Sequence, residues 1–194
     1  MPADYASMAI AELFEQTAAP TPAPGGGSIA ALTVGLSAAL VTMIARSSRD
    51  SWPDAAGIAA QALELAERCP RLAQDDAAAW EEAFAGLQDA VEGNNEPGAA
   101  PLRPMLDRSA ELPLAIAEAG ADVAVLAALA ASRGDGALRA DAISAALLAH
   151  AGARVGAHLV AVNLGTREGD ARSSRAAAAE RRAARALADA VGMP

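Results

Sequence analysis

Three consecutive glycines, followed by a serine and a long apolar segment, form the most unusual local pattern in this sequence. Gly25, Gly26, Gly27 and Ser28 lead directly into residues 29–45. Because glycines let backbone N–H groups converge, and because the N-terminal end of a helix favours negative charge, this loop can bind an anion such as a carboxylate. The alternative interpretation is a flexible linker in which Ser28 only caps the helix. Neither a Walker lysine nor a dinucleotide-binding spacing accompanies the glycines.

A pair of acids, Asp75 and Asp76, precedes Trp80 near the start of a predicted helix. Neighbouring helical residues point about 100° apart, so one acid can face the protein interior while the other faces solvent. An inward carboxyl group beside Trp80 would be desolvated, which raises its pKa and suits it to donate a proton. The alternative is that both acids only stabilise the N-terminal end of the helix.

Asp141 and Asn163 stand near opposite ends of another predicted helix, about six turns apart. Each can serve in a site, or can simply cap its end of the helix. His150 and His158 are eight residues apart, about 12 Å along a helix, which is too far for one metal ion. The sequence contains neither an HExxH motif nor a Cys/His cluster, and we expect no metal site.

The elements that must position these residues are predicted to be helices throughout. Hydrophobic residues make up 53% of the 194 residues and aromatic residues only 3%, which favours a core of small aliphatic side chains and close helix contacts. Pro70 is expected to break or kink a helix, Pro104 and Pro113 to kink one, and residues 93–98 to form a loop. The predicted helices cover residues 3–16, 28–46, 54–69, 71–92, 102–132, 138–163 and the chain from about 173.

We therefore predict an all-α fold: one domain over residues 1–194, built as a multi-helical bundle around the long buried helix 29–45, with a C-terminal helix in residues 170–194. Residues 29–45 fall slightly short of a membrane span and include several polar or small side chains. The first helix carries acids and lacks the basic start of a signal peptide.

Charge and composition exclude several function classes. The net charge of −9 argues against a nucleic acid or an anionic membrane as a partner. All 15 basic residues in the Lys+Arg count are arginines, which excludes Schiff-base chemistry on a lysine. The single cysteine, Cys69, cannot form an internal disulfide and fits a reducing compartment, so we expect a cytoplasmic protein.

In order and spacing, these segments resemble the formimidoyltetrahydrofolate cyclodeaminase and methenyltetrahydrofolate cyclohydrolase family over about residues 5–165. Residues 22–31, which contain the glycine run, look like the Gly-rich signature of that family, and residues 76–80 look like its Asp-x-x-Ala-Phe segment. Residues 112–118 look like its Val-Pro-Leu-x-x-Ala-Glu segment, residues 141–148 like its Ser-Asp helix with Ala140 in place of the serine, and residues 162–164 like its closing Val-x-Asn-Leu.

One segment departs from the family pattern. Where the family carries Gly-Lys-Lys-Lys-Tyr, expected to help hold folate, residues 46–52 read Arg-Ser-Ser-Arg-Asp-Ser-Trp. We expect Arg49 to replace a lysine charge and Trp52 to stack on the pterin ring as the tyrosine would.

The resemblance implies an all-helical homodimer that acts on a tetrahydrofolate derivative without a metal or redox cofactor. Folate N10 would attack a formimino carbon and ammonia would leave, or water would attack the methenyl carbon. Asp76 would be the general acid and Asp141 its orienting partner. The substrate would be held by Gly25, Gly26, Gly27, Ser28, Arg49, Trp52 and Asn163. The alternative is a non-catalytic helical dimer, a scaffold or regulatory protein that has lost the folate site.

Overall fold

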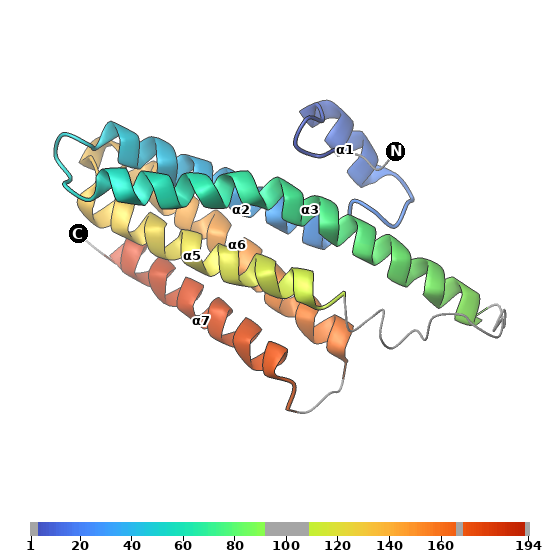
Figure 1. Cartoon of the computed structure of the whole chain (residues 1–194). Helices are drawn as coiled ribbons and strands as arrows, with labels where there is room; N and C mark the ends of the chain where they lie inside the picture. Colours follow the sequence, from blue (N-terminus) through green and yellow to red (C-terminus); the bar gives the residue numbers. More distant parts are fainter. Residues whose placement is uncertain (1–3, 92–108, 166–168, 193–194) are drawn as a thin grey trace.

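The computed structural model describes residues 4–91, 109–165 and 169–192, and the chain is helical through nearly all of them (Figure 1). The described residues contain no strand, which confirms the predicted all-α fold. The elements are α1 (Ile10–Ala18), α2 (Gly26–Ser47), α3 (Ala55–Val91), α5 (Glu111–Arg133), the short 3-10 turn η1 (Gly136–Leu138), α6 (Arg139–Leu164) and α7 (Ala171–Gly192).

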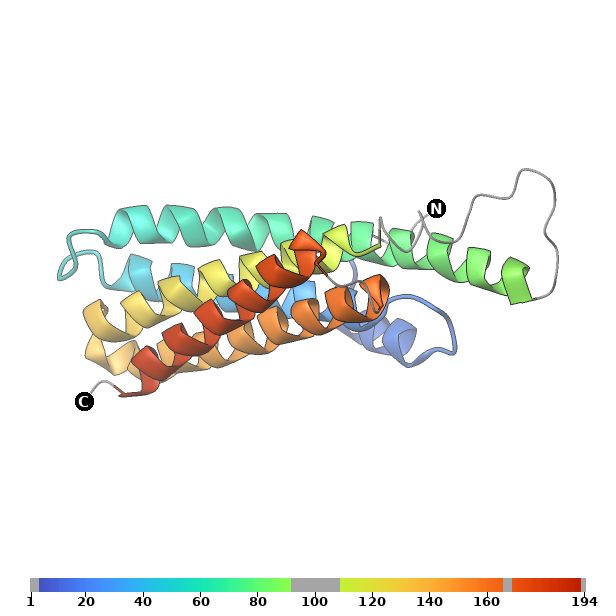
Figure 2. The ribbon, with the colours of Figure 1, turned by 90° about the horizontal axis from the view of Figure 1, so that it is seen from below.

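Five of these helices pack along one direction into an elongated bundle, while α1 lies outside it (Figures 1 and 2). The last turns of α3 project beyond the ends of the other helices in both views. Helix α5 contacts α2, α3, α6 and α7. Helix α2, expected as the buried centre, has twelve buried residues and shares that position with α5, which has thirteen.

Small side chains let the helices approach closely, as the composition predicted. At Gly120 in α5, an added Cβ would lie 2.8 Å from the backbone nitrogen of Ala153 and 2.9 Å from the carbonyl oxygen of Ala149, both in α6. Gly156 in α6 approaches the backbone of Pro113 and Ala117 in the same way. Backbone therefore meets backbone where α5 crosses α6, and the geometry of this pair depends on glycine.

Two proline predictions differ from the structure. Helix α3 continues through Pro70, so the predicted break there is wrong. The buried side chains of Cys69 and Leu72 hold both halves of α3 against the bundle, and this packing outweighs the lost hydrogen bond. Pro113 lies in the first turn of α5, where a missing N–H costs no helical bond, so it produces no kink. Pro104 and the predicted loop 93–98 lie outside the described residues.

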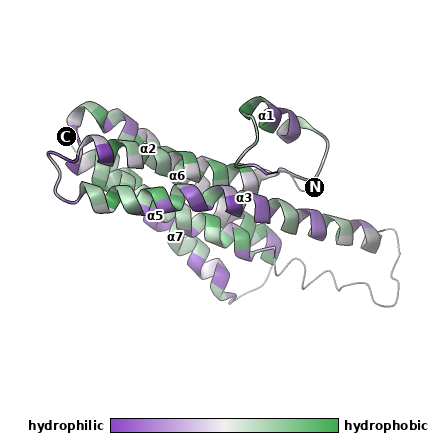
Figure 3. Ribbon diagram, turned by 45° about the horizontal axis from the view of Figure 1, so that its top comes forward, coloured by the Kyte–Doolittle hydropathy of each residue, from purple (hydrophilic) through white to green (hydrophobic). Residues whose placement is uncertain are grey.

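Three segments are long and apolar enough to cross a membrane by length and composition: α2, α5 and residues 136–164. In the most apolar 18-residue stretch of each segment, the share buried inside the bundle is 61% for α2, 67% for α5 and 39% for residues 136–164. Figure 3 shows hydrophobic residues running through these packed helices. Helix α6 is thus the least covered of the three, and part of its apolar surface remains exposed.

Candidate active site

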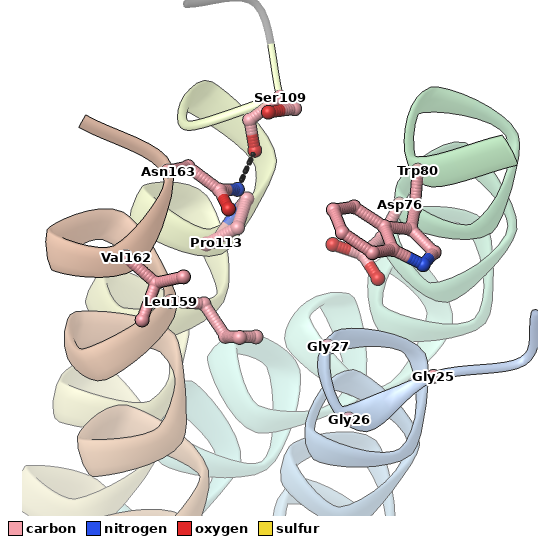
Figure 4. Close-up of a pocket in the computed structure, with 10 residues that line it drawn as sticks. All are labelled: Gly25, Gly26, Gly27, Asp76, Trp80, Ser109, Pro113, Leu159, Val162 and Asn163. Atoms are coloured by element: carbon pink, nitrogen blue, oxygen red, sulfur yellow. Dashed lines mark hydrogen bonds between the residues drawn. The ribbon is translucent and has the colours of Figure 1, made fainter. Parts of the chain in front are cut away.

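A cavity of about 230 Å³ opens where the start of α2, the middle of α3, the start of α5 and the end of α6 meet. Figure 4 shows the α2 and α3 residues on one side of the open space and the α5 and α6 residues on the other. Four segments distant in sequence therefore form one site. The lining residues are Gly25, Gly26, Gly27, Asp76, Trp80, Ser109, Pro113, Leu159, Val162 and Asn163.

The carboxyl group of Asp76 is held against the first turn of α2. The Ser28 hydroxyl lies 3.2 Å from Asp76 Oδ2, and the Ser28 backbone N–H also donates to this carboxyl group. Helix α2 begins at Gly26 with Gly25 as its N-cap, so the prediction that Ser28 is the N-cap is wrong. Ser28 lies inside the first turn instead, where its fully buried side chain binds Asp76.

The environment of Asp76 opposes its ionisation. Burial raises the pKa of Asp76 to about 6, although the hydrogen bonds from Ser28 act in the opposite direction. This is the shift expected for an inward carboxyl group beside Trp80, whereas its neighbour Asp75 is exposed. Burial also raises the pKa of Tyr5, with a further contribution from the charges of Glu81 and Asp76. The N-terminal segment therefore helps to shield this end of α3 from water.

The walls of the cavity are mostly apolar. Pro113 is buried, while Leu159 and Val162 reach the cavity from the last turns of α6. Asn163 Nδ2 donates a hydrogen bond of 2.8 Å to the carbonyl oxygen of Ser109, which fixes the orientation of the amide (Figure 4). The site thus combines a low-polarity wall with a few oriented polar groups, as is typical of small-molecule sites.

The comparisons with known proteins identify the family and the fold. The sequence profile of the formiminotransferase-cyclodeaminase family matches residues 9–183. The chain belongs to this family. Its fold is similar to the crystal structure of formiminotetrahydrofolate cyclodeaminase from Thermotoga maritima, with a TM-score of 0.79 and 21% sequence identity over 96% of this chain and 93% of that chain. No curated protein sequence matches the chain.

The family segments do not all meet at this cavity within one chain. Asp141 is exposed at the start of α6, about 33 Å along the helix from Asn163. Arg49 lies in the turn after α2, at the opposite end of that helix from Gly25, and its exposed side chain is 3.8 Å from Asp50. Within one chain, the structure brings neither residue to the pocket that contains Asp76.

Trp52 was expected to stack on a bound ring, and this prediction is wrong. Its side chain is only 5% exposed and packs in the main hydrophobic core. The tryptophan that borders the cavity is Trp80, one helical turn after Asp76. The family segment in which Trp80 replaces a phenylalanine was recognisable in the sequence, but its position next to the cavity was not.

At the glycine run, the structure differs from the expected binding site for an external anion. Ser28 directs its hydroxyl and its backbone N–H to Asp76, so the negative group at the N-terminal end of α2 belongs to the protein itself. Five lining residues were not among the predicted site residues: Trp80, Ser109, Pro113, Leu159 and Val162. Trp80, Pro113 and Val162 lie within the recognised family segments 76–80, 112–118 and 162–164, and this was the available signal.

Proposed function

We propose that this chain is a folate-dependent one-carbon enzyme that acts as a formimidoyltetrahydrofolate cyclodeaminase or a methenyltetrahydrofolate cyclohydrolase. The observation that carries the proposal is the partly buried carboxyl group of Asp76, which lies in a largely apolar cavity with a pKa of about 6. Such a group can both accept and donate a proton near neutral pH. Membership in the formiminotransferase-cyclodeaminase family supplies the substrate class.

In the deaminase reaction, the lone pair of N10 attacks the carbon of the protonated formimino group on N5, forming the C–N10 bond. The Asp76 carboxylate accepts the proton from N10 and passes it to the amino group on the same carbon. Ammonia then leaves with the C–N bond electrons, and the positive charge remains on the N5–C–N10 methenyl bridge. Asp76 thus acts as the general acid for the leaving amine and returns to its ionised form.

In the hydrolase reaction, water attacks the methenyl carbon and loses one proton to Asp76 as the C–O bond forms. As one C–N bond breaks, Asp76 returns its proton to the released nitrogen, and the remaining hydroxyl proton is lost to solvent as the C=O bond of the formyl group forms. Neither reaction changes the oxidation level of the carbon, so neither requires a redox cofactor. The free, buried thiol of Cys69 is compatible with the cytoplasm, where we place the enzyme.

We also propose that the enzyme is a homodimer that pairs through the exposed apolar side of α2 and α6. Leu36 is 68% exposed on α2 and Val162 is 58% exposed on α6, where it also borders the cavity. Between them, the groove formed by Ile29, Thr33 and Val155 is lined mainly by apolar and small residues. Burial of such a self-complementary face is the usual basis of a two-fold dimer.

A two-fold axis perpendicular to α2 and α6 would pair the helices of the two copies in antiparallel directions. The exposed Asp141 of one copy would then approach the cavity of the other, which would reconcile its predicted catalytic role with its distance from Asp76. Coexpression of Asp76→Asn and Asp141→Asn chains tests this arrangement. Mixed dimers, about half of the total, would each contain one intact site of two, so the whole mixture would regain about a quarter of the parental activity. Failure of the mixture to regain activity, with both variants dimeric, would overturn the shared site.

The experiment that tests the function is turnover of 5-formimino- and 5,10-methenyl-tetrahydrofolate, followed by the absorbance of the methenyl group. We expect turnover by the parent, collapse in Asp76→Asn, and near-parental activity in Asp75→Asn. Asp75 is the matched control because it is the adjacent acid and is exposed. No turnover of either compound and no folate binding would favour the non-catalytic dimer.

A further inference from the structure

The charge of the cavity is distinctive. Among the described residues that line it, Asp76 is the only ionisable side chain, and none is an arginine. A pKa of about 6 leaves this carboxyl group mainly ionised at neutral pH. Asn163, which commits its amide nitrogen to Ser109, adds an oriented carbonyl oxygen as a second acceptor. The polar groups of the site therefore suit a ligand that carries positive charge and N–H donors.

The aromatic ring of Trp80 lies beside that negative charge. Trp80 follows Asp76 by four residues on α3, so the two side chains share one face of the helix. Figure 4 shows the indole ring and the carboxyl group together on the α3 side of the open space, opposite Pro113, Leu159 and Asn163. Trp80 also packs against Phe84, with ring centroids 6.3 Å apart and planes tilted by 47°, which restricts the orientation of the indole ring.

The opposite wall determines what can occupy the space in front of this ring. Pro113, Leu159 and Val162 offer no hydrogen-bond donors from their side chains and give that side an apolar surface. A cation that faces an aromatic ring is attracted by the ring quadrupole, most strongly for tryptophan and when water is excluded. A carboxylate one helical turn away adds direct charge attraction.

We propose that this cavity selects a planar, delocalised cation, which stacks against Trp80 with the Asp76 carboxylate at its edge. If the proposed function holds, on which this assignment to folates rests, the cation is the amidinium of a formimino group and, after reaction, the N5–C–N10 methenyl bridge. Trp80 would then determine specificity by binding the charged reacting group, while Asp76 moves the proton.

A pair of small probes tests the selection without a folate. Benzamidinium and benzamide have nearly the same shape, but only the first is a delocalised cation. In a Trp52→Phe background, Trp80 is the only remaining tryptophan, so its fluorescence reports directly on the cavity. We expect benzamidinium to quench this fluorescence and to bind at least about tenfold more tightly than benzamide.

Substitutions of Trp80 separate stacking from general packing. Trp80→Phe keeps an aromatic ring and should weaken benzamidinium binding about threefold, whereas Trp80→Leu should weaken it about tenfold, as measured by calorimetry. Benzamide binding should change little in either variant. If Trp80→Leu does not fold, as judged by circular dichroism, the phenylalanine variant still provides the comparison. Equal binding of the two probes by the parent, or equal losses for both in the variants, would overturn the proposal.

The outcomes also separate this proposal from the proposed function. Selective benzamidinium binding without folate turnover would support the cation site and refute the enzyme activity. Folate turnover without selection for benzamidinium would support the enzyme activity and refute the cation site. Competitive inhibition of turnover by benzamidinium, lost in Trp80→Leu, would support both together.

Discussion

Gly27 and the carboxyl group of Asp76 lie so close together that position 27 has no room for a side chain. A Cβ at Gly27 would overlap Cγ and both carboxyl oxygens of Asp76. At the adjacent Gly26, by contrast, a Cβ would meet nothing within 4 Å. The glycine run therefore has a specific steric role at its third position, which is to admit Asp76 to the first turn of α2.

Gly27→Ala should displace Asp76 from Ser28 and reduce turnover by about a hundredfold, because small displacements of a catalytic group have effects of this size. Steady-state kinetics with the formimino substrate measures the loss. Gly57→Ala is the control, because Gly57 is an exposed helical glycine with nothing within 4 Å of its added Cβ. Parental activity in Gly27→Ala would show that Asp76 can act from another position.

Asp76→Asn should stabilise the fold at pH 8 while it abolishes activity. The folded-state pKa of about 6 exceeds the usual value of 3.8, so the Asp76 contribution to stability is complete below pH 3.8 and is lost as the pH rises through 6. At pH 8 the parent carries the full cost of a buried charge, which asparagine avoids, and the variant should gain about 1–2 kcal/mol in the free energy of unfolding. Urea denaturation at pH 4 and pH 8 checks this, and an equal difference at both pH values would contradict it.

Ser28→Ala should move the pH profile of turnover. In the proposed mechanism Asp76 starts as a carboxylate, so kcat/KM should rise with pH through about 6 in the parent. Removing the Ser28 hydroxyl removes a hydrogen bond that lowers the pKa of Asp76, so the rising limb should shift upward by about one pH unit. A parental profile that falls above pH 6 instead would mean that Asp76 must be protonated from the start.

Gly120→Ala should destabilise the bundle by about 1–3 kcal/mol, because the added Cβ would meet the backbone of α6 rather than a movable side chain. Gly57→Ala should stabilise the protein by about 0.5–1 kcal/mol through its higher helix propensity. Thermal or urea unfolding of the two variants measures both effects. A neutral Gly120→Ala variant would show that α5 and α6 can separate without loss.

The local determinants of the fold were readable from the sequence. Apolar periodicity, glycines and prolines predicted the helices of the described residues with two differences. Helix α1 begins at Ile10 and not at residue 3. Helix α3 also continues through Pro70, where packing of Cys69 and Leu72 outweighs the local cost of proline. The desolvation of Asp76 beside Trp80 was also predictable, because a spacing of four residues on a helix puts both side chains on one face. Residues 76–80 therefore carried the central feature of the site.

The sequence by itself determined the helical class and the family motifs, because these depend on short-range spacing, and the resemblance to the family singled out Asp76 from the acid pair. Only the tertiary structure decided which helix ends meet. The α2 N-terminus and the α6 C-terminus form the cavity, whereas Arg49, Trp52 and Asp141 lie at the other end of the bundle. Which helix ends lie together depends on how antiparallel helices pack. No local sequence pattern indicates whether a tryptophan side chain faces the core or a cavity.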